Sequence, residues 1–425
     1  MVLPIRRGKF EMEDRISTLP SNIIEAILLR LPIADAVRSS VLSSRWRYEW
    51  STIPHLIFDK HSVPLSLHYK LDKIVDQVLL LHSGPIHKFV FDGSACLEDC
   101  SVVNRWITVL SRNSLKELVL RFCPDRIYKL PSTLFFCKGI VILELHDCEF
   151  RLPRVFEGFG SLCTLSLENV VISDNDFATL ISKCSLLEKV AFMDFYGCSR
   201  LRFNAPNLRE LIIDGLFEDI YLENTPDLAI LSVGLDDADD LDDEGDSDNE
   251  DLENKEHYNF MTSLNAVPKI ENLSLRHNML ELLAGDSLLD RLPTYSYLKK
   301  LYLTCVNFED TKHIAILRCL FRSAPVLEEL TIEADSVDSS NPAASFWEGK
   351  ECADFRFNHL RYLTVTEILG VGPEMELIEF VLANSPVLET LFIRLDNDVC
   401  DEVKIYKQIM RFRRASTRAE IINLD

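Results

Sequence analysis

The residues that could carry chemistry in this 425-residue chain are scattered. Its ten histidines are dispersed, and no phosphate-binding glycine loop, HExxH pair or GxSxG turn occurs. The closest cysteines, Cys96 and Cys100, have no second cysteine or histidine pair at zinc-finger spacing. We therefore predict no catalytic residue, no metal site and no cofactor. The twelve cysteines are expected to be free thiols of a reducing compartment.

One modification site is suggested by an acidic run at 236–257, which is almost free of apolar residues. It holds more than half of the formal net charge of −22, and we expect it to be a disordered insertion. Ser247 has acidic neighbours on both sides and suits a kinase of the casein-kinase-2 type, although such serines arise easily in acidic segments. The run lacks the glycine and ligand spacing of an EF-hand loop.

Apolar residues at helical spacing stand near the N-terminus. They give a face too broad for a helix of about ten residues to bury against itself: Ile23, Ile24, Ile27, Leu28 and Leu31. Ser21 or Asn22 is expected to cap this helix and Pro32 to end it. A second amphipathic piece follows, and a third carries Trp46 and Trp50. Three small helices with so little core need a covering partner.

Residues 14–50 resemble an F-box in nearly every position by which plant F-boxes are recognised, from Leu19-Pro20 to Arg45-Trp46-Arg47. The resemblance implies binding to the Skp-family adaptor of a cullin-RING ubiquitin ligase. The residues implied to pack against the adaptor are Leu19, Pro20, Ile23, Ile27, Leu28, Leu31, Pro32, Val37, Leu42 and Trp46.

An internal repeat predicts the fold of the remaining chain. The pattern apolar-x-x-apolar-x-apolar returns about every 20 to 33 residues, the range of leucine-rich repeats. Examples are Leu115-Leu118-Leu120, Leu298-Leu301-Leu303 and Leu388-Leu391-Ile393. Each unit is too thin to bury its own apolar side. We predict an α/β solenoid with parallel strands on the concave side and helices on the convex side, including helices at 98–111, 174–183, 310–322 and 374–383.

Residues between the repeated apolar positions should point to the concave face, where a partner could contact them. This face shows no basic run, so we expect no nucleic-acid partner. Aromatic and charged residues there are candidates for binding an unknown protein target, or else ordinary solvated positions: Glu144, Arg276, Tyr302, Tyr362, Phe392 and Arg394.

The last segment resembles the FBD region of plant F-box proteins, through HLRYLTVTEI, MELIEFVLANSPVLETLFI and YKQIMRFRRASTRAEI. We interpret 359–425 as the last two repeats plus a capping helix over 401–412. The expected domains are a flexible N-terminus at 1–13, an F-box at 14–55, leucine-rich repeats at 56–358 and this FBD region.

These resemblances imply the non-catalytic substrate receptor of an SCF-type ubiquitin ligase. The alternative is a repeat scaffold whose F-box delivers no target for degradation, and an α/β enzyme with an unrecognised site is a distant third. No secretion signal or membrane-length apolar run is present. We therefore expect a soluble protein of the cytoplasm or nucleus, without a membrane partner.

Overall fold

The computed structural model describes residues 16, 18–64, 66, 70–93, 101–124, 126–236, 259–284, 292–335, 347, 355–397, 399 and 401–424. The predicted flexible N-terminus, Cys96, Cys100 and Ser247 lie outside these residues, as does the acidic run apart from Asp236. The chain divides into two compact units, residues 1–149 and 150–425, which are described separately. No helix in the described ranges is both long and apolar enough to cross a membrane.

Short helices open the N-terminal unit: α1 (Ser21–Leu28), α2 (Ile33–Arg38) and the 3-10 helices η1 (Ser39–Val41) and η2 (Glu49–Thr52). The capping prediction was wrong. Pro20 occupies the N-cap of α1, and no side chain caps this helix. The helix also ends at Leu28, before the proline expected to stop it. The third predicted helix is a series of turns followed by η2.

A parallel sheet completes the N-terminal unit. Its strands are ordered β1 (His55–Phe58), β2 (Lys88–Asp92), β3 (Glu117–Arg121) and β5 (Ile142–Glu149), and β4 (Tyr128–Lys129) pairs with β5. Helices α3 (Leu71–Leu81) and α4 (Ser101–Leu110) lie in the connections between strands. Trp106 of α4 packs edge-on against Phe91 at 4.9 Å and donates to Asp76 of α3 at 2.6 Å. This one side chain therefore joins both helices to the sheet.

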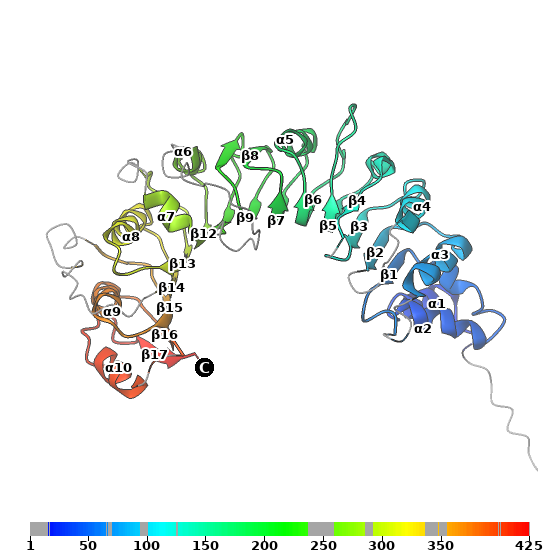
Figure 1. Cartoon of the computed structure of the whole chain (residues 1–425). Coiled ribbons are helices and arrows are strands. Elements are labelled where there is room, and N and C mark those ends of the chain that lie inside the picture. The colour runs from blue at the N-terminus through cyan, green and yellow to red at the C-terminus, as the bar shows by residue number, and fades with distance from the viewer. Residues whose placement is uncertain are drawn as a thin grey trace, which may run out of the picture. The chain divides into compact units, whose positions relative to one another are not determined.

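The C-terminal unit is built on ten parallel strands that follow an arc (Figure 1). In order across the sheet they are β6 (Thr164–Val171), β7 (Lys189–Tyr196), β9 (Glu210–Gly215), β11 (Ile230–Leu235), β12 (Asn272–His277), β13 (Lys300–Val306), β14 (Glu329–Ala334), β15 (Tyr362–Ile368), β16 (Thr390–Leu395) and β17 (Glu420–Asn423). The repeated apolar residues align in register, as Leu273, Leu301 and Leu330 do, and they are buried. The predicted α/β repeat fold is confirmed.

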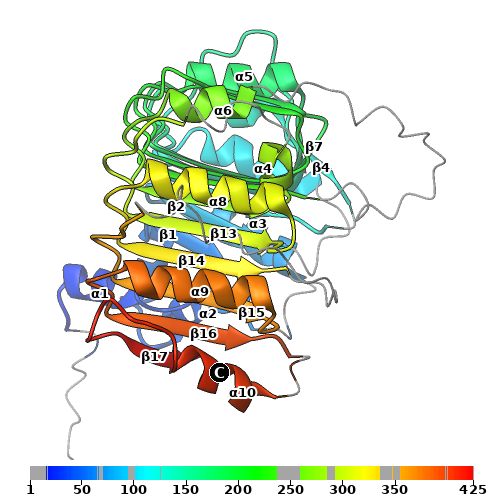
Figure 2. The same cartoon turned by 90° about the vertical axis from the view of Figure 1, so that its left-hand side faces the viewer.

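The outer side of this arc carries a second layer. It contains α5 (Asp174–Lys183), α6 (Asn259–Asn265), α7 (Met279–Ala284), α8 (Thr311–Ser323) and α9 (Gly372–Asn384), with α8 and α9 running alongside the strands in Figure 2. Four of the expected helices are therefore present, α4 included. Between α5 and α6 the layer is a parallel pair, β8 (Arg200–Asn204) and β10 (Asp219–Glu223). The repeats starting at Leu187 and Leu208 are only about 20 residues long, which leaves too few residues for a helix.

A left-handed residue recurs near the carboxyl ends of the strands, and in β15 it accompanies a shift in the pairing register. Backbone φ is +51° at Asn169, +49° at Asp194, +53° at His277 and +57° at Glu367. Asn and Asp adopt this conformation more readily than most residues, whereas Glu pays a larger steric cost. These residues bring polar side chains of successive repeats to the carboxyl ends of the strands.

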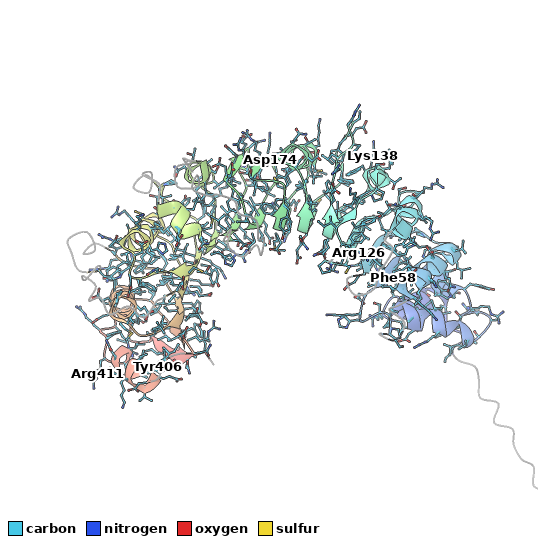
Figure 3. All side chains as sticks on the ribbon, viewed as in Figure 1. Phe58, Arg126, Lys138, Asp174, Tyr406 and Arg411 are labelled. Atoms are coloured by element: carbon cyan, nitrogen blue, oxygen red, sulfur yellow. The ribbon has the colours of Figure 1, made fainter. Side chains whose placement is uncertain are left out.

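Asp174 begins α5 on the outer side of the unit (Figure 3). It accepts hydrogen bonds from the N–H groups of Ser199 and Arg200, both at 2.9 Å. Burial opposes its ionisation, but hydrogen bonds from Arg200, Cys198 and Ser199 outweigh that effect and hold the pKa of Asp174 below its ordinary 3.8. The ionised carboxylate therefore favours the folded state.

We expect Asp174→Asn to destabilise the protein at neutral pH, because the amide accepts the two N–H bonds less strongly. A lowered folded pKa means that this stabilisation is present above 3.8 and is lost as the pH falls through the folded value. The difference in urea midpoint between wild type and variant should thus be constant above about pH 5 and shrink below pH 4. A difference that grows on acidification would contradict this account.

The C-terminal end differs from its prediction. Helix α10 (Glu402–Ile409) matches the expected capping helix in position; Tyr406 lies on it in Figure 3, and Arg411 follows its end. The chain then continues into β17, which pairs in parallel with β16. The edge of the sheet is therefore an unpredicted strand rather than a helix.

Candidate docking and recognition surfaces

The N-terminal helices share a small apolar core of their own. Its buried side chains are Ile24, Leu28, Ile33, Ala36, Trp46 and Trp50. The indole N–H of Trp46 donates to the carbonyl of Ile16 at 3.1 Å. This bond ties the segment before α1 to the turns that precede η2. Two of the ten predicted adaptor-binding residues, Leu28 and Trp46, lie in this core. They have almost no surface to offer and hold the other eight in place.

The other predicted adaptor-binding residues lie at or near the surface. Ile23 and Ile27, one helical turn apart on α1, are 42% and 37% exposed. Pro20, Leu31, Pro32 and Leu42 are also exposed, while Leu19 and Val37 are half-buried. Exposed apolar residues that are not among the ten predicted adaptor-binding residues lie close by along the chain: Ile16, Leu29 and Val41. Val41 is 87% exposed, a cost in water that a protein contact would remove.

We call the inner side of the C-terminal sheet, opposite the helices, the open face. Its central row holds one half-buried, uncharged residue from each strand from β6 to β16: Ser166, Ala191, Ile212, Ser232, Ser274, Tyr302, Thr331, Thr364 and Phe392. The hydroxyls of Ser232, Ser274, Thr331 and Thr364 make no hydrogen bond with any described residue. They are available to a partner.

Charged residues flank this row and pair with each other across neighbouring strands. Lys189 contacts Glu210 at 2.7 Å and Lys300 contacts Glu329 at 2.8 Å. Such pairs contribute little to stability when exposed. They do neutralise one another, so the open face presents paired charges around a neutral centre.

The six predicted target-binding residues fall into two groups. Five already have polar partners: Glu144 with Arg121 in the N-terminal unit, and Arg276 with Asp214, Tyr302 with Glu333, Tyr362 with Glu389 and Arg394 with Glu367 in the C-terminal unit. Phe392 instead presents an aromatic ring between Thr364 and Ile422 of the adjacent strands. Their role in binding stays a prediction.

Tyr302 stands beside a hollow of about 320 Å³ on the open face. Ser232 and Ser274 lie on one side of the hollow, and Lys300 and Glu329 lie on the other. Burial, together with the negative charge of Glu333, raises the pKa of Tyr302. The hydroxyl therefore stays protonated at neutral pH and donates to Glu333 at 3.2 Å. The sequence analysis named Tyr302 but did not predict the hollow. The hollow exists because the small side chains of Ser232 and Ser274 occupy β11 and β12 beside the tyrosine.

Two buried cysteines, Cys137 and Cys184, are unsuited to nucleophilic chemistry. Burial raises the pKa of Cys137 and of Cys184 to about 11. Almost no thiolate exists at neutral pH under those conditions. These residues pack as small apolar side chains.

Comparison with known proteins finds three family models along the chain. The F-box domain matches residues 16–56, the LRR repeats of FBD-associated F-box protein At5g56370 match 103–240, and the FBD model matches 357–393. F-box/FBD/LRR-repeat protein At1g13570 of Arabidopsis thaliana is 37% identical over 98% of this chain and 99% of its own length. F-box/LRR-repeat protein 13 of the same plant is 25% identical over 97% and 96%. F-box/FBD/LRR-repeat protein At5g56420 is 31% identical over 51% and 54%.

The α/β architecture of N-terminal helices followed by a long parallel-strand sheet is that of an F-box joined to a leucine-rich-repeat solenoid. The chain belongs to the F-box/FBD/LRR-repeat protein family of plants.

Proposed function

We propose that this protein is the substrate-binding subunit of an SCF-type ubiquitin ligase. Its F-box would bind the Skp-family adaptor, and its open face would bind the protein to be ubiquitinated. The observation that carries the proposal is the F-box match at 16–56, in which apolar side chains stay exposed after the unit has formed its own core.

The exposed apolar side chains of the F-box would be more stable against a protein partner than in water. Ile23, Ile27 and Leu31 lie on α1 or just after it, and Leu42 follows η1. Each large aliphatic side chain contributes about 1.5 to 3 kcal/mol when its exposed surface is fully buried. These four side chains are 37% to 53% exposed, so each would contribute roughly half of that. Because association carries an entropic cost, the neighbouring exposed residues Ile16, Leu29 and Val41 would have to add to the contact.

Catalysis would then consist of positioning. The bonds to ubiquitin would be made by other subunits, while this chain raises the effective concentration of the target's lysines near the loaded ubiquitin-carrying enzyme. The hydroxyl-rich, neutral centre of the open face supports a target contact made through hydrogen bonds and apolar side chains. Tyr302 and Phe392 would be its anchors, since aromatic residues dominate such interfaces.

The target can be trapped with a docking-deficient chain. We expect the variant Ile23→Asp with Ile27→Asp to accumulate its target when expressed in plant cells, because binding continues without ubiquitination. Adding Tyr302→Ala and Phe392→Ala should lower recovery about 30-fold, the effect of losing an anchor worth 2 kcal/mol. Affinity capture with quantitative mass spectrometry measures both quantities.

Tyr297→Ala is the matched control. Tyr297 is 57% exposed but precedes β13 instead of lying in the central row, so recovery should not change. Equal recovery after the Tyr302 and Phe392 changes would remove the open face from the proposal. If the captured proteins are no more abundant with the docking-deficient chain than with wild type, the protein is a scaffold and not a receptor.

A further inference from the structure

Three side chains that could bind a metal ion meet at one edge of the C-terminal sheet. Asp214 lies at the end of β9, Asp236 directly follows β11, and His277 ends β12. These strands are neighbours. The His277 Nε2 atom is 3.5 Å from Asp214 Oδ1 and 4.0 Å from Asp236 Oδ1, and the three ligand atoms lie within 4.8 Å of one another.

The spacing resembles that of ligands around one ion. In a tetrahedral zinc site with bonds of about 2.0 to 2.1 Å, the ligand atoms are separated by about 3.3 Å. The observed 3.5 and 4.0 Å exceed this separation by less than 1 Å, and the Asp214–Asp236 separation, at most 4.8 Å, exceeds it by no more than about 1.5 Å. Since both residues at the longer distance lie near the ends of strands, small side-chain rotations can remove these differences.

Asp214 Oδ1 is directed into this cluster and lacks any compensating bond. It is buried, with no hydrogen-bond partner among the described residues. A buried carboxylate oxygen without a partner is costly. The other oxygen, Oδ2, is held by Arg276 Nη2 at 2.7 Å, as metal-binding carboxylates are commonly held by a neighbouring donor. One oxygen is thus fixed and the other remains available to a cation.

Gly234 makes the space for this arrangement. A Cβ atom at position 234 would lie 2.3 Å from Asp214 Oδ1 and 2.9 Å from His277 Cδ2. Any other residue at this central strand position would push the two ligands apart. The cluster therefore depends on a glycine located where a strand normally disfavours one.

The backbone holds the other two ligands. The N–H of Asp236 donates to Gly215 O at 3.3 Å, and the N–H of His277 donates to Thr304 Oγ1 at 2.8 Å. Negative charge exceeds positive charge nearby. The carboxylates of Asp214 and Asp236 meet in the cluster, whereas Arg276 supplies one positive charge beside Asp214. A divalent cation would relieve this repulsion.

We propose that Asp214, Asp236 and His277 form a binding site for a divalent transition metal of the Zn²⁺ class, with water completing the coordination. The imidazole favours Zn²⁺ over Mg²⁺ and Ca²⁺, which prefer oxygen ligands alone. The bound ion would link three neighbouring strands at the point where the acidic run leaves the sheet. This site rests on none of the docking residues of the proposed function, but it adjoins the open face, because Arg276, which holds Asp214, is one of the predicted target-binding residues.

The test is titration of the purified full-length chain with Zn²⁺ by calorimetry and with Co²⁺ by visible absorption. We expect one site per chain, a Co²⁺ spectrum typical of tetrahedral nitrogen and oxygen ligation, and little competition from excess Ca²⁺. His277→Asn should weaken Zn²⁺ binding by at least about 100-fold, because loss of a direct ligand should cost no less than the roughly 10- to 100-fold seen for outer-shell changes. Asparagine tolerates the left-handed backbone of position 277, so the fold should be retained. Asp236→Asn is expected to weaken binding similarly.

His359→Asn is the matched control, because His359 is an exposed histidine of the same unit outside the cluster. It should bind Zn²⁺ as the wild type does. Zn²⁺ binding that survives His277→Asn unchanged would assign the metal to the acidic run and overturn the site. Absence of stoichiometric Zn²⁺ binding by a wild-type chain with a normal circular dichroism spectrum would overturn it as well.

Discussion

Replacing Ile23 and Ile27 with aspartate should abolish binding to the Skp-family adaptor without unfolding the protein. Both side chains are exposed in the chain alone, so the carboxylates are hydrated in the free variant. In the proposed complex they would be enclosed by apolar surface, which costs several kcal/mol for each unpaired charge. We expect affinity to fall at least about 100-fold, measured by surface plasmon resonance against the purified adaptor.

Two further variants separate docking from folding. Leu80→Asp is the matched control, because Leu80 of α3 is 83% exposed and is not one of the proposed docking residues; adaptor affinity should be unchanged. Leu28→Ala tests folding instead. Loss of this buried side chain should lower the free energy of unfolding by about 2 to 5 kcal/mol. Wild-type affinity in the double aspartate variant would show that the adaptor does not contact this side of α1.

Which leucines and isoleucines of α1 face inward could not be predicted from the sequence. Its four large apolar residues, Ile23, Ile24, Ile27 and Leu28, all fit a helical stripe, and a helix this short carries no internal signal of its buried side. That side is set by the chain that packs against it: α1 contacts η2, which carries the buried Trp50. Tertiary packing therefore decided that Leu28 is core and Ile27 is surface.

The repeats were easier to predict, because a period-two strand pattern fixes which side chains are buried. Leu273, Leu301 and Leu330 occupy the predicted core positions. Two features were not predicted. Strand β17 has only four residues, too few for a recognisable pattern, and the β8 and β10 pair was indicated only by the short spacing of the repeats. The Asp214, Asp236 and His277 cluster was missed because parallel register, and not spacing along the chain, joins its members.

Glu374→Ala should produce the largest loss of stability in the C-terminal unit. Glu374 is a fully buried carboxylate in the first turn of α9. It accepts hydrogen bonds from the N–H groups of Gly370 at 2.7 Å, Val371 at 3.0 Å and Leu369 at 3.3 Å. Val371 at the N-cap has no polar side chain, so these N–H groups depend on Glu374.

Removing the carboxylate leaves three part-buried N–H donors without their acceptor. Hydrogen bonds to a charged acceptor contribute about 1.5 to 3 kcal/mol each, with losses that are not additive. The negative charge also stabilises the N-terminal end of the helix dipole. We expect the free energy of unfolding to fall by about 3 to 5 kcal/mol and the melting temperature by roughly 10 °C.

Glu379→Ala provides the comparison on the same helix, because Glu379 is exposed and its change should cost less than about 0.5 kcal/mol. Glu374→Gln should fall between the two, since the amide keeps one acceptor oxygen but turns an N–H₂ group toward N–H donors. Differential scanning calorimetry of the three variants gives the order. If Glu374→Ala and Glu379→Ala unfold at the same temperature, the start of α9 is held by packing around Pro373 and Met375, and the buried carboxylate contributes no net stability.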